Sequence, residues 1–419
     1  MRFVLVSTHV DQTTGYSKVS HNLIKQVATL SPKVKTFHFG FQRHPSKASM
    51  RKYPEGVVSY DAAANEDPKE EGFGYNKIHD YIETVTPDVV MIYNDPLVVC
   101  KFIETMKHER GKSPYKLWIY IDQVYMGIAP PLLETMYAHA DRIYCFTEIW
   151  KNKFLEYGAF PDVRVLEHAV DPTMFTCMPE DARMAIRKNI SIPDGATILL
   201  NANRNSQRKR LDLTLGGFVR LLKRQPDQLN YLIIITSLSP QSGAYYDIQR
   251  CFAEELADAG LDPQTFARRL VLIDNALPNL WSDEAINQLY NVADIGINTS
   301  DGEGFGLCQL EHMYTGAPQI VTDVGSYKTF LDTNVAEFVK TNGRCYFAGG
   351  MPFGVWAPTF SMDDVATAME ETIARLAEKK KAVQAYQFKS WASICDGWLD
   401  DVLTEAGGQV AIVSVPVPT

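Results

Sequence analysis

A strand, a glycine-rich turn and a helix follow one another without a break between residues 293 and 316. The apolar run at 293–298 is typical of a buried strand, and a helical pattern ends at Thr315-Gly316, with Pro318 beyond it. Glycines in the turn allow the backbone to approach a ligand closely, and the first turn of a helix presents unpaired N–H groups. A turn of this kind holds a phosphate.

Two glutamates, Glu303 and Glu311, frame this turn with seven residues between them. A carboxylate would repel a phosphate, so we expect both side chains to accept hydrogen bonds from hydroxyl groups instead. On an ordinary helix the same spacing would describe two solvated acids, but the surrounding turn favours a ligand site. A phosphate beside hydroxyl groups indicates a nucleotide sugar.

This segment resembles the donor-binding motif of the retaining glycosyltransferases of family 4. In that family two glutamates separated by seven residues are followed by Gly-x-Pro-Val-Ile; here residues 303–307 read Glu-Gly-Phe-Gly-Leu and residues 316–320 read Gly-Ala-Pro-Gln-Ile. The resemblance implies an α/β protein of the GT-B fold, with two Rossmann-like parallel-sheet domains facing a central cleft. The closest resemblance is to divergent members of the family, virus-encoded ones among them.

The rest of the chain repeats the strand, loop and helix pattern in both halves, which is typical of doubly wound sheets. The 419 residues suffice for two or three domains, and Asp171-Pro172 reads as the turn between two of them. We predict an acceptor-side domain at 1–172, completed by C-terminal helices at about 387–419, and a donor-binding domain at 173–386. Predicted strands lie at 3–6, 87–93, 117–121, 142–146, 196–200, 231–236, 270–273 and 294–298.

Composition excludes several other classes of protein. The net charge of −9 argues against a general nucleic-acid binder, which would carry a basic excess. The seven cysteines are dispersed, without a Cys-x-x-Cys pair or zinc spacing, and so indicate free thiols in a reducing compartment. The first residues lack a signal-peptide pattern, and no window approaches the roughly 18 apolar residues of a membrane span. We therefore expect a cytoplasmic protein, in the host cytosol if it is virus-encoded.

A cationic loop follows the predicted strand at 196–200. Family 4 members hold an Arg and a Lys of this loop against the donor phosphates, and the resemblance implies that Arg204 and Lys209 take these positions. Fixed cations stabilise the charge that the diphosphate gains as its bond to the sugar breaks. No Asp-x-Asp pair is present, so we expect these cations to replace a metal ion and predict no metal site.

The resemblance also implies how the donor is held. The diphosphate would contact the amides of Phe305, Gly306 and Leu307, while Glu311 would bind the ribose hydroxyls and Glu303 the hydroxyls of the donor sugar. We predict catalytic roles for Glu303 and the two cations of the 204–209 loop.

Two loops complete the expected donor site. In family 4 a glycine after the first strand lies against the diphosphate, and Gly15 is the matching residue, although an ordinary tight turn would also account for it. The loop after the strand at 270–273 flanks the nucleobase in relatives, which places Asn275 there.

Asp122 stands where many family members carry a histidine close to the donor sugar and the acceptor. It comes directly after the predicted strand at 117–121, and ligands bind at the carboxyl ends of such strands. Asp122 could orient an acceptor hydroxyl or act as a base. It could equally cap the following segment.

Three further features stay open at the level of sequence. The basic stretch at 42–52 is typical of a solvated loop, although some relatives use such a patch against anionic membranes or acidic acceptors. His168 could face the cleft, but a hydrogen-bonded structural histidine is favoured. Residues 410–418 are apolar and interrupted by prolines, so we expect them to pack on the body of the protein or on a second subunit, as in a homodimer.

We interpret the chain as a retaining hexosyltransferase that takes a sugar from a nucleotide-diphosphate donor to a glycan or glycoconjugate acceptor. The Arg-Asn-x-x-Arg-Lys loop at 204–209 resembles that of members that use GDP-mannose, which favours mannose; a UDP-sugar is the alternative. A non-catalytic nucleotide-sugar-binding protein is a rival class, because Asp122 replaces the usual histidine. A Rossmann dehydrogenase is a second rival, which the absence of Gly-x-Gly-x-x-Gly disfavours.

Overall fold

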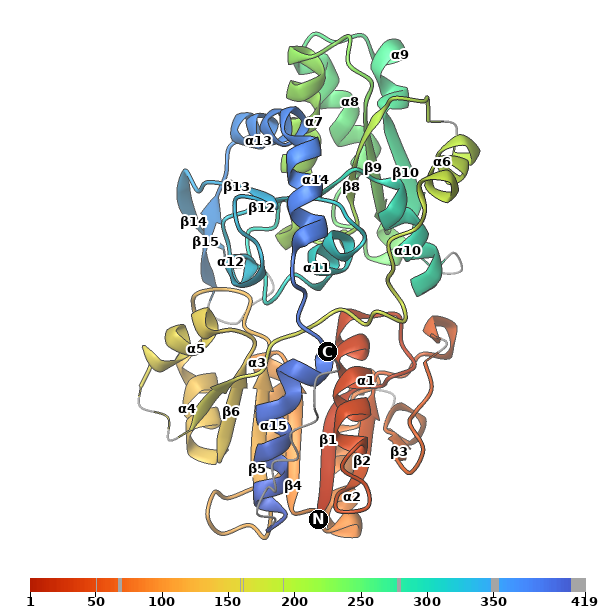
Figure 1. Ribbon diagram of the computed structural model, residues 1–419. Coiled ribbons are helices and arrows are strands. Elements are labelled where there is room, and N and C mark those ends of the chain that lie inside the picture. The colour runs from red at the N-terminus through yellow and green to blue at the C-terminus, as the bar shows by residue number, and fades with distance from the viewer. Residues whose placement is uncertain are drawn as a thin grey trace.

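Two parallel sheets, each covered by helices, make up the protein, and one domain stands above the other in Figure 1. The computed structural model describes residues 1–49, 51–66, 70–158, 160, 162–190, 192–276, 280–347 and 354–407. Among these residues, the strand order is β3-β2-β1-β4-β5-β6-β7 in the first sheet and β10-β9-β8-β11-β12-β13 in the second. Every neighbouring pair in both sheets is parallel.

The first domain alternates strands with helices in chain order. Its strands are β1 (Arg2–Thr8), β2 (Lys35–Phe41), β3 (Val58–Asp61), β4 (Val89–Asn94), β5 (Lys116–Ile121), β6 (Arg142–Cys145) and β7 (Val163–Val165). Its helices are α1 (Gly15–Ala28), α2 (Ile78–Val85), α3 (Pro96–Met106), α4 (Pro130–His139) and α5 (Glu148–Leu155). Short 3₁₀ helices lie at Pro45–Lys47, Ala63–Asn65 and Tyr75–Lys77.

The second domain repeats the alternation. Its strands are β8 (Thr197–Asn201), β9 (Asn230–Thr236), β10 (Leu270–Asp274), β11 (Ile295–Asn298), β12 (Gln319–Thr322) and β13 (Ala336–Val339), and an antiparallel hairpin pairs β14 (Gly343–Phe347) with β15 (Val355–Thr359). Its helices are α6 (Glu180–Asn189), α7 (Leu211–Arg224), α8 (Ile248–Asp258), α9 (Pro263–Phe266), α10 (Asp283–Val292), α11 (Leu307–Tyr314), α12 (Tyr327–Phe330), α13 (Met362–Ala374) and α14 (Leu376–Ala385). Short 3₁₀ helices lie at Gln207–Lys209, Pro240–Ser242 and Ala267–Arg269.

Local chemistry explains where several of these elements begin. All six residues of β4 are buried, as expected of a strand covered on both faces. Helix α3 begins where the Asp95 carboxylate accepts hydrogen bonds from the amides of Leu97 and Val98, with Pro96 in the first turn. Helix α7 turns Leu213, Phe218 and Leu221 toward the core, as the sequence predicted.

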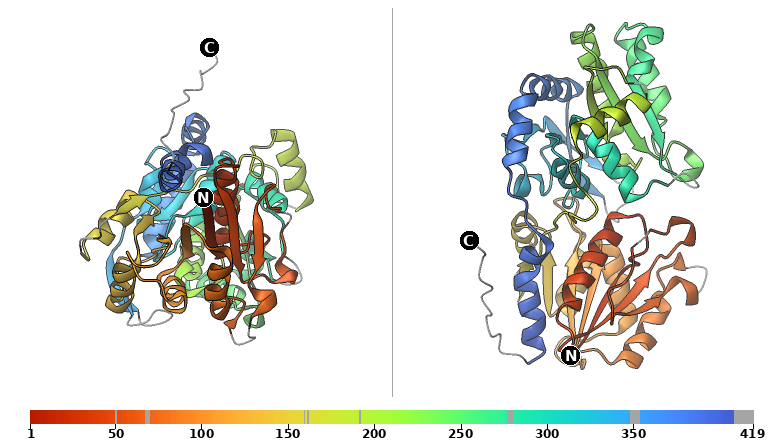
Figure 2. Two further views of the ribbon diagram at one scale, coloured as in Figure 1. Left: turned by 90° about the horizontal axis from the view of Figure 1, so that it is seen from below. Right: turned by 45° about the vertical axis from the view of Figure 1, so that its right-hand side comes forward.

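The last described helix, α15 (Trp391–Glu405), crosses back to the first domain and runs along it in Figures 1 and 2. Trp398 packs edge-on against Phe3 of β1, with ring centroids 5.9 Å apart, and Asp401 accepts a hydrogen bond from Tyr144 of β6 at 2.7 Å. The apolar segment at 410–418 lies outside the described residues. The predicted boundaries at 172 and 387 stay predictions.

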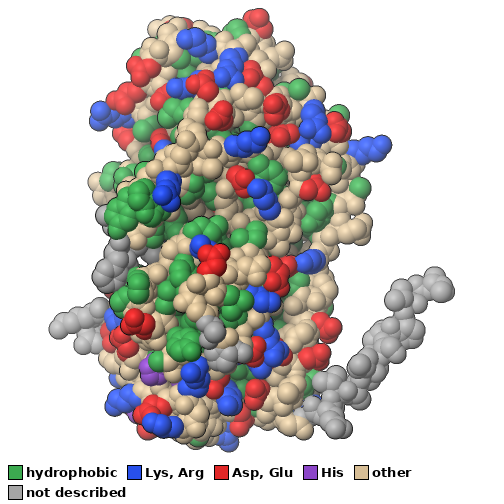
Figure 3. Space-filling model, turned by 90° about the vertical axis from the view of Figure 1, so that its left-hand side faces the viewer, with side chains coloured by type: hydrophobic (Ala, Val, Ile, Leu, Met, Phe, Trp, Pro, Cys, Tyr) green, Lys and Arg blue, Asp and Glu red, His purple; other side chains and the backbone are tan. Residues whose placement is uncertain are grey.

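Charges of both signs are interspersed over both domains on the face shown in Figure 3. This pattern, together with the net charge of −9, gives no basic surface on that face of the kind that nucleic acids require.

Candidate functional site

Several of the predicted site residues lie where the two domains touch. The indole N–H of Trp150, in α5, donates a hydrogen bond to the carbonyl of Gly304 at 2.6 Å, and the Tyr125 hydroxyl donates one to Asp301 at 2.9 Å. Both bonds join the first domain to the turn between β11 and α11. The glycine-rich turn is therefore held against the first domain at two points.

Gly306 shapes the start of α11. Its φ of 97° is left-handed, and a Cβ on this residue would lie 2.4 Å from a ring carbon of Tyr327. Phe305 is buried between Phe330 and His168, with centroid distances of 5.1 and 4.7 Å. Among the described residues, the N–H groups of Phe305, Gly306 and Leu307 donate none of the backbone hydrogen bonds found outside helices and strands. These amides have the free hydrogens that an anion needs.

Glu303 lies against the cationic loop. Its carboxylate is 2.5 Å from the Lys209 ammonium and 3.3 Å from the guanidinium of Arg208, which also donates to the carbonyl of Gly302. Burial alone would raise the pKa of Glu303, but these two cations outweigh it and lower the pKa to about 2. Glu303 is therefore ionised at every physiological pH and accepts hydrogen bonds only.

Arg204 and Lys209, which the sequence paired, are placed differently. The Lys209 side chain is 11% exposed and contacts Glu303, whereas Arg204 is exposed, and none of the ion pairs or side-chain hydrogen bonds found within the described ranges involves its side chain. Arg208 takes the position beside Glu303 instead. The sequence showed Arg208 only as one of several adjacent cations, and nothing in its spacing distinguished it.

Glu311 lies one helical turn into α11 and is almost fully buried, with 2% of its side chain exposed. Lys18, from α1 of the other domain, donates to both carboxylate oxygens at 2.7 and 2.9 Å. The Tyr290 hydroxyl approaches one of these oxygens at 3.3 Å. Burial raises the pKa of Glu311, and Lys18 opposes the shift. The sequence reasoning missed Lys18.

Asp122 follows β5 and faces the same turn. It accepts a hydrogen bond from the Tyr16 hydroxyl at 2.6 Å through one oxygen, while its other oxygen is buried without a partner among the described residues. That free oxygen would lie 2.1 Å from a Cβ at Gly304. Burial raises the pKa of Asp122 to about 6, against the opposing effects of Tyr16 and Arg208. No capping bond from a backbone amide is found for this residue among the described ones.

Gly15 begins α1, and Asn275 directly follows β10. Gly15 opens α1 without a left-handed φ, and a Cβ there would meet nothing within 4 Å, so the fold itself does not require glycine. Asn275 uses its side-chain oxygen to accept the Trp281 amide at 2.8 Å, which closes the loop after β10. The neighbouring residues 277–279 lie outside the described ranges.

The structure shows the surroundings of His168 and of the basic stretch at 42–52, two features that the sequence left open. His168 packs among Phe146, Phe305 and Trp391, and burial lowers its pKa to about 3. The expected hydrogen bond is wrong, because neither ring nitrogen has a partner in the part of the chain that the structure describes. Apolar packing alone holds this histidine.

The basic stretch is partly neutralised. Arg43 pairs with Asp11 and Asp61 at 2.9 and 3.0 Å, and Arg51 pairs with Asp283 at 2.6 Å. Arg43 and Arg51 therefore form ion pairs within the protein.

Three other features bear on what the protein could bind. Within the described residues, no group of three or more His, Cys, Asp or Glu side chains is arranged to hold a metal ion. No helix in those ranges is both long and apolar enough to cross a membrane. A groove of about 580 Å³ lies among Lys35, Tyr60 and Tyr81 on the first domain and contains none of the predicted site residues.

Residues 196–346 match the family described as "Glycosyl transferases group 1". A D-inositol 3-phosphate glycosyltransferase of Geodermatophilus obscurus is 30% identical over 213 residues, which cover 50% of this chain and 44% of that protein. The enzyme of the same name from Salinispora arenicola is 26% identical over 272 residues, which cover 64% of this chain and 55% of that protein. The chain spans about half the length of the curated relatives it matches.

Solved structures resemble the whole chain. A sucrose-phosphate synthase from Thermosynechococcus elongatus aligns with a TM-score of 0.67 and 15% identity over 97% of this chain and all of that one. Anabaena HepE in complex with UDP and glucose aligns with a TM-score of 0.64 and 12% identity over 96% of this chain and all of that one. These likenesses confirm the predicted fold, which is the GT-B arrangement of two parallel-sheet α/β domains.

Proposed function

We propose that this protein is a retaining glycosyltransferase that moves a hexose from a nucleotide-diphosphate sugar to a hydroxyl of a glycan or glycoconjugate. One observation carries the proposal: Glu303, Lys209 and Arg208 cluster at the open amino end of α11, opposite Asp122. Cations, free amides and carboxylates converging at one junction are what an activated sugar requires. The family match over 196–346 and the fold support the same activity.

The donor would lie across this junction. Its diphosphate would contact Lys209, Arg208 and the amides of residues 305–307, with Arg204 able to approach from the loop surface. Glu311 would bind the ribose hydroxyls, and Asn275 would lie beside the base. The open space at Gly15 leaves room for the phosphates.

The two acids that would lie nearest the reacting atoms, Glu303 and Asp122, differ in their pKa values. Glu303, with a pKa of about 2, stays ionised and can accept hydroxyls of the donor sugar. Asp122, with a pKa of about 6, is largely ionised at pH 7, and its unpartnered oxygen can accept a hydrogen bond from the acceptor hydroxyl. We infer that Asp122 faces the acceptor hydroxyl.

By analogy with family 4, the acceptor oxygen would attack the anomeric carbon on the same face of the sugar from which the phosphate leaves. The acceptor oxygen forms its bond to the anomeric carbon as the bond from that carbon to the phosphate oxygen breaks. The acceptor proton passes to the leaving phosphate, whose negative charge Lys209 and Arg208 stabilise. Contact between the domains excludes water from this step.

GDP-mannose is our preferred donor, because the loop at 204–209 resembles that of members that use it. UDP-sugars are the alternative, and the HepE structure contains UDP and glucose. Calorimetric titration with a panel of nucleotide sugars separates the two, since only the true donor should bind in the micromolar range. Virus encoding, cytoplasmic location and a homodimer stay predictions.

Donor hydrolysis without an acceptor tests whether the protein is a catalyst. A transferase of this kind allows slow attack by water, whereas a nucleotide-sugar-binding protein, the rival that Asp122 keeps open, should leave the donor intact. Glu311→Ala should weaken donor binding and Glu303→Ala should mainly lower turnover. Unchanged values for both variants would remove the basis of the site assignment.

We further propose that no metal ion is required, because Lys209 and Arg208 supply the positive charge. Turnover should persist in excess chelator. Complete loss that Mg²⁺ or Mn²⁺ restores would overturn this part of the proposal.

A further inference from the structure

Lys18 connects the two domains through the acid that we assign to the donor. It projects from the first turns of α1, and its ammonium lies 2.7 Å from one oxygen and 2.9 Å from the other oxygen of Glu311, 293 residues away. The side chains are 16% and 2% exposed. Solvent therefore screens this pair far less than an ordinary surface ion pair.

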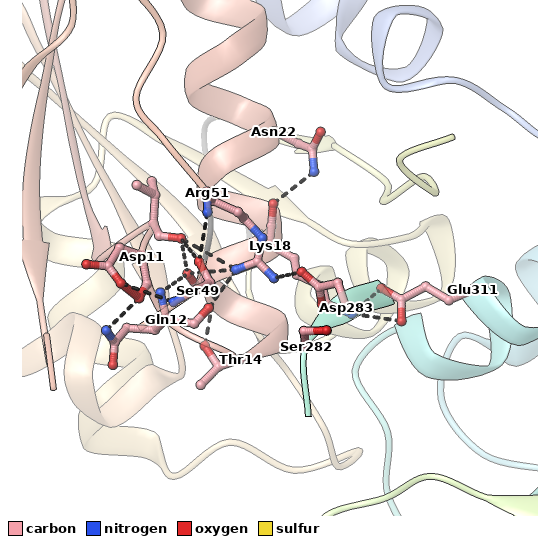
Figure 4. A network of polar contacts seen from close by, with 12 residues as sticks. Asp11, Gln12, Thr14, Lys18, Asn22, Ser49, Arg51, Ser282, Asp283 and Glu311 are labelled. Atoms are coloured by element: carbon pink, nitrogen blue, oxygen red, sulfur yellow. Dashed lines mark hydrogen bonds and ion pairs between the residues drawn. The ribbon is translucent and has the colours of Figure 1, made fainter. Parts of the chain in front are cut away.

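A second ion pair lies beside the first. Arg51 of the first domain contacts Asp283, at the start of α10, at 2.6 Å, and Asp283 is also 3.5 Å from Lys18. Figure 4 shows these side chains pointing toward one another from the two domains. Arg51 also donates to the carbonyl of Gln12 at 2.6 Å. The loop that leads to Gly15 is thus tied to the same contact.

The cluster is balanced in charge and divided between the domains. Its two cations, Lys18 and Arg51, come from the first domain, and its two carboxylates, Asp283 and Glu311, come from the second. Separating the domains would leave each half with like charges, and would therefore break every pair at once.

We propose that Lys18 and Arg51 form an ionic latch that holds the domains together, and that a donor's ribose must displace Lys18 from Glu311. The displacement part rests on the proposed function; the latch part does not. Lys18 thereby sets donor affinity, and links donor binding to the position of the first domain. Lys18 is a positioning residue in this scheme, because it acts through Glu311.

Competition follows from the geometry of Glu311. Lys18 engages both carboxylate oxygens, and Tyr290 adds a contact to one of them. Ribose presents two hydroxyl donors that need those same oxygens, and a carboxylate that is 2% exposed offers little further access.

Nucleotide binding tests the displacement. Calorimetry with UDP and with GDP should give about three- to tenfold tighter binding for Lys18→Met than for wild type, because the competing cation is gone. Lys18→Arg retains the charge and should stay near the wild-type affinity. If Lys18→Met binds these nucleotides no more tightly than wild type, ribose does not displace Lys18 from Glu311. Thermal unfolding confirms that each variant is folded.

The distance between the domains tests the latch without any ligand. Spin labels at Glu104→Cys in α3 and Asp258→Cys in α8, with the exposed Cys177 and Cys345 replaced by serine, report domain separation. Adding Lys18→Met should lengthen the distance or broaden its distribution. An unchanged distribution would overturn the latch.

Asp283→Asn gives an independent check of the latch. This change weakens the Arg51 pair and leaves Glu311 intact, so it should also lengthen the distance between the labels. If neither UDP nor GDP binds the wild-type protein, the proposed function fails, and the label distances alone then decide whether the latch exists.

Discussion

Burial of Asp122 should destabilise the fold at the pH at which we propose that this residue acts. Its pKa is raised from 3.8 to about 6 in the folded protein, first by burial. The folded state therefore binds a proton more tightly than the unfolded state, and the free energy of unfolding should fall as pH rises through this interval, by up to about 3 kcal/mol. The buried charge is present at neutral pH and destabilises the fold.

Asp122→Asn should separate these two effects. Asparagine can still accept the Tyr16 hydroxyl but never ionises, so the variant should be about 1–3 kcal/mol more stable than wild type at pH 8 and similar at pH 4. Its kcat/KM should fall by roughly 100-fold, because a neutral amide orients the acceptor hydroxyl less well than the ionised Asp122. Urea unfolding at both pH values and initial rates check the prediction; an equal stability change at pH 4 and pH 8 contradicts it.

The second prediction compares the effects of replacing Arg208 and Arg204 on nucleotide binding. Arg208→Gln removes a cation that contacts Glu303 and Gly302, whereas Arg204 is exposed in this structure. Losing one charged hydrogen bond to the diphosphate costs about 1.5–3 kcal/mol, so Arg208→Gln should weaken UDP or GDP binding by roughly 10- to 150-fold. Arg204→Gln should have the smaller effect in calorimetry, and the reverse order would restore the assignment made from sequence.

Spacing could predict the cationic loop at 204–209 but not that Arg208 lies beside Glu303. The resemblance placed a cation at 204 because of its distance from Lys209. The 3₁₀ turn Gln207–Lys209 instead turns Arg208 toward the carbonyl of Gly302. That contact depends on a turn about 94 residues away, which local sequence patterns do not encode.

At the scale of elements, the amino end of α11 is the most constrained feature. Gly306→Ala would force a left-handed φ of 97° on alanine and press its Cβ to 2.4 Å from Tyr327. We expect a loss of about 2–4 kcal/mol in the free energy of unfolding. Nucleotide binding should weaken as well, because the amides of 305–307 would move. Chemical denaturation and calorimetry measure the two effects.

Gly397→Ala is the matched control. Gly397 lies inside α15, and a Cβ there would meet nothing within 4 Å. Alanine is the better helix former by up to about 1 kcal/mol, so this change should stabilise the protein and leave nucleotide binding unaltered. Similar losses in both variants would mean that the geometry of Gly306 has no special role.

Elements with continuous apolar patterns were predictable, and those with buried polar groups were not. The strands β4, β5, β9 and β10 fall where the sequence placed them. Strand β2 escaped prediction because His38 interrupts its pattern. His38 is tolerated there only because its ring nitrogens contact the hydroxyls of Ser7 at 2.9 Å and Tyr53 at 2.7 Å. The hairpin β14–β15 escaped for a different reason: its buried Val355 and Ala357 pack on Tyr125 of the other domain, and this distant contact leaves no local pattern.

At the scale of the whole molecule, the sequence predicted two sheets and a returning helix but not how the domains engage. A pattern can predict that Glu311 binds a ligand. It cannot show that Lys18 fills the hydrogen-bonding positions of Glu311, because that pairing depends on the angle between two folded domains. Contacts of this kind join segments far apart in the chain, here 293 residues, so local sequence patterns do not record them.

The returning helix carries the last prediction, which concerns how the end of the described chain supports its beginning. Trp398 is 2% exposed and packs on Phe3, so Trp398→Ala should lower the free energy of unfolding by about 3–5 kcal/mol. Hydrogen exchange should rise first in peptides of β1 and β4, because the cavity opens in their core, while β9 of the second domain keeps its protection. Trp356→Ala, at a side chain that is 53% exposed, should change neither measurement appreciably. Equal loss of protection in both domains after Trp398→Ala would show instead that the two sheets unfold as one unit, held together by the same contacts that join Lys18 to Glu311.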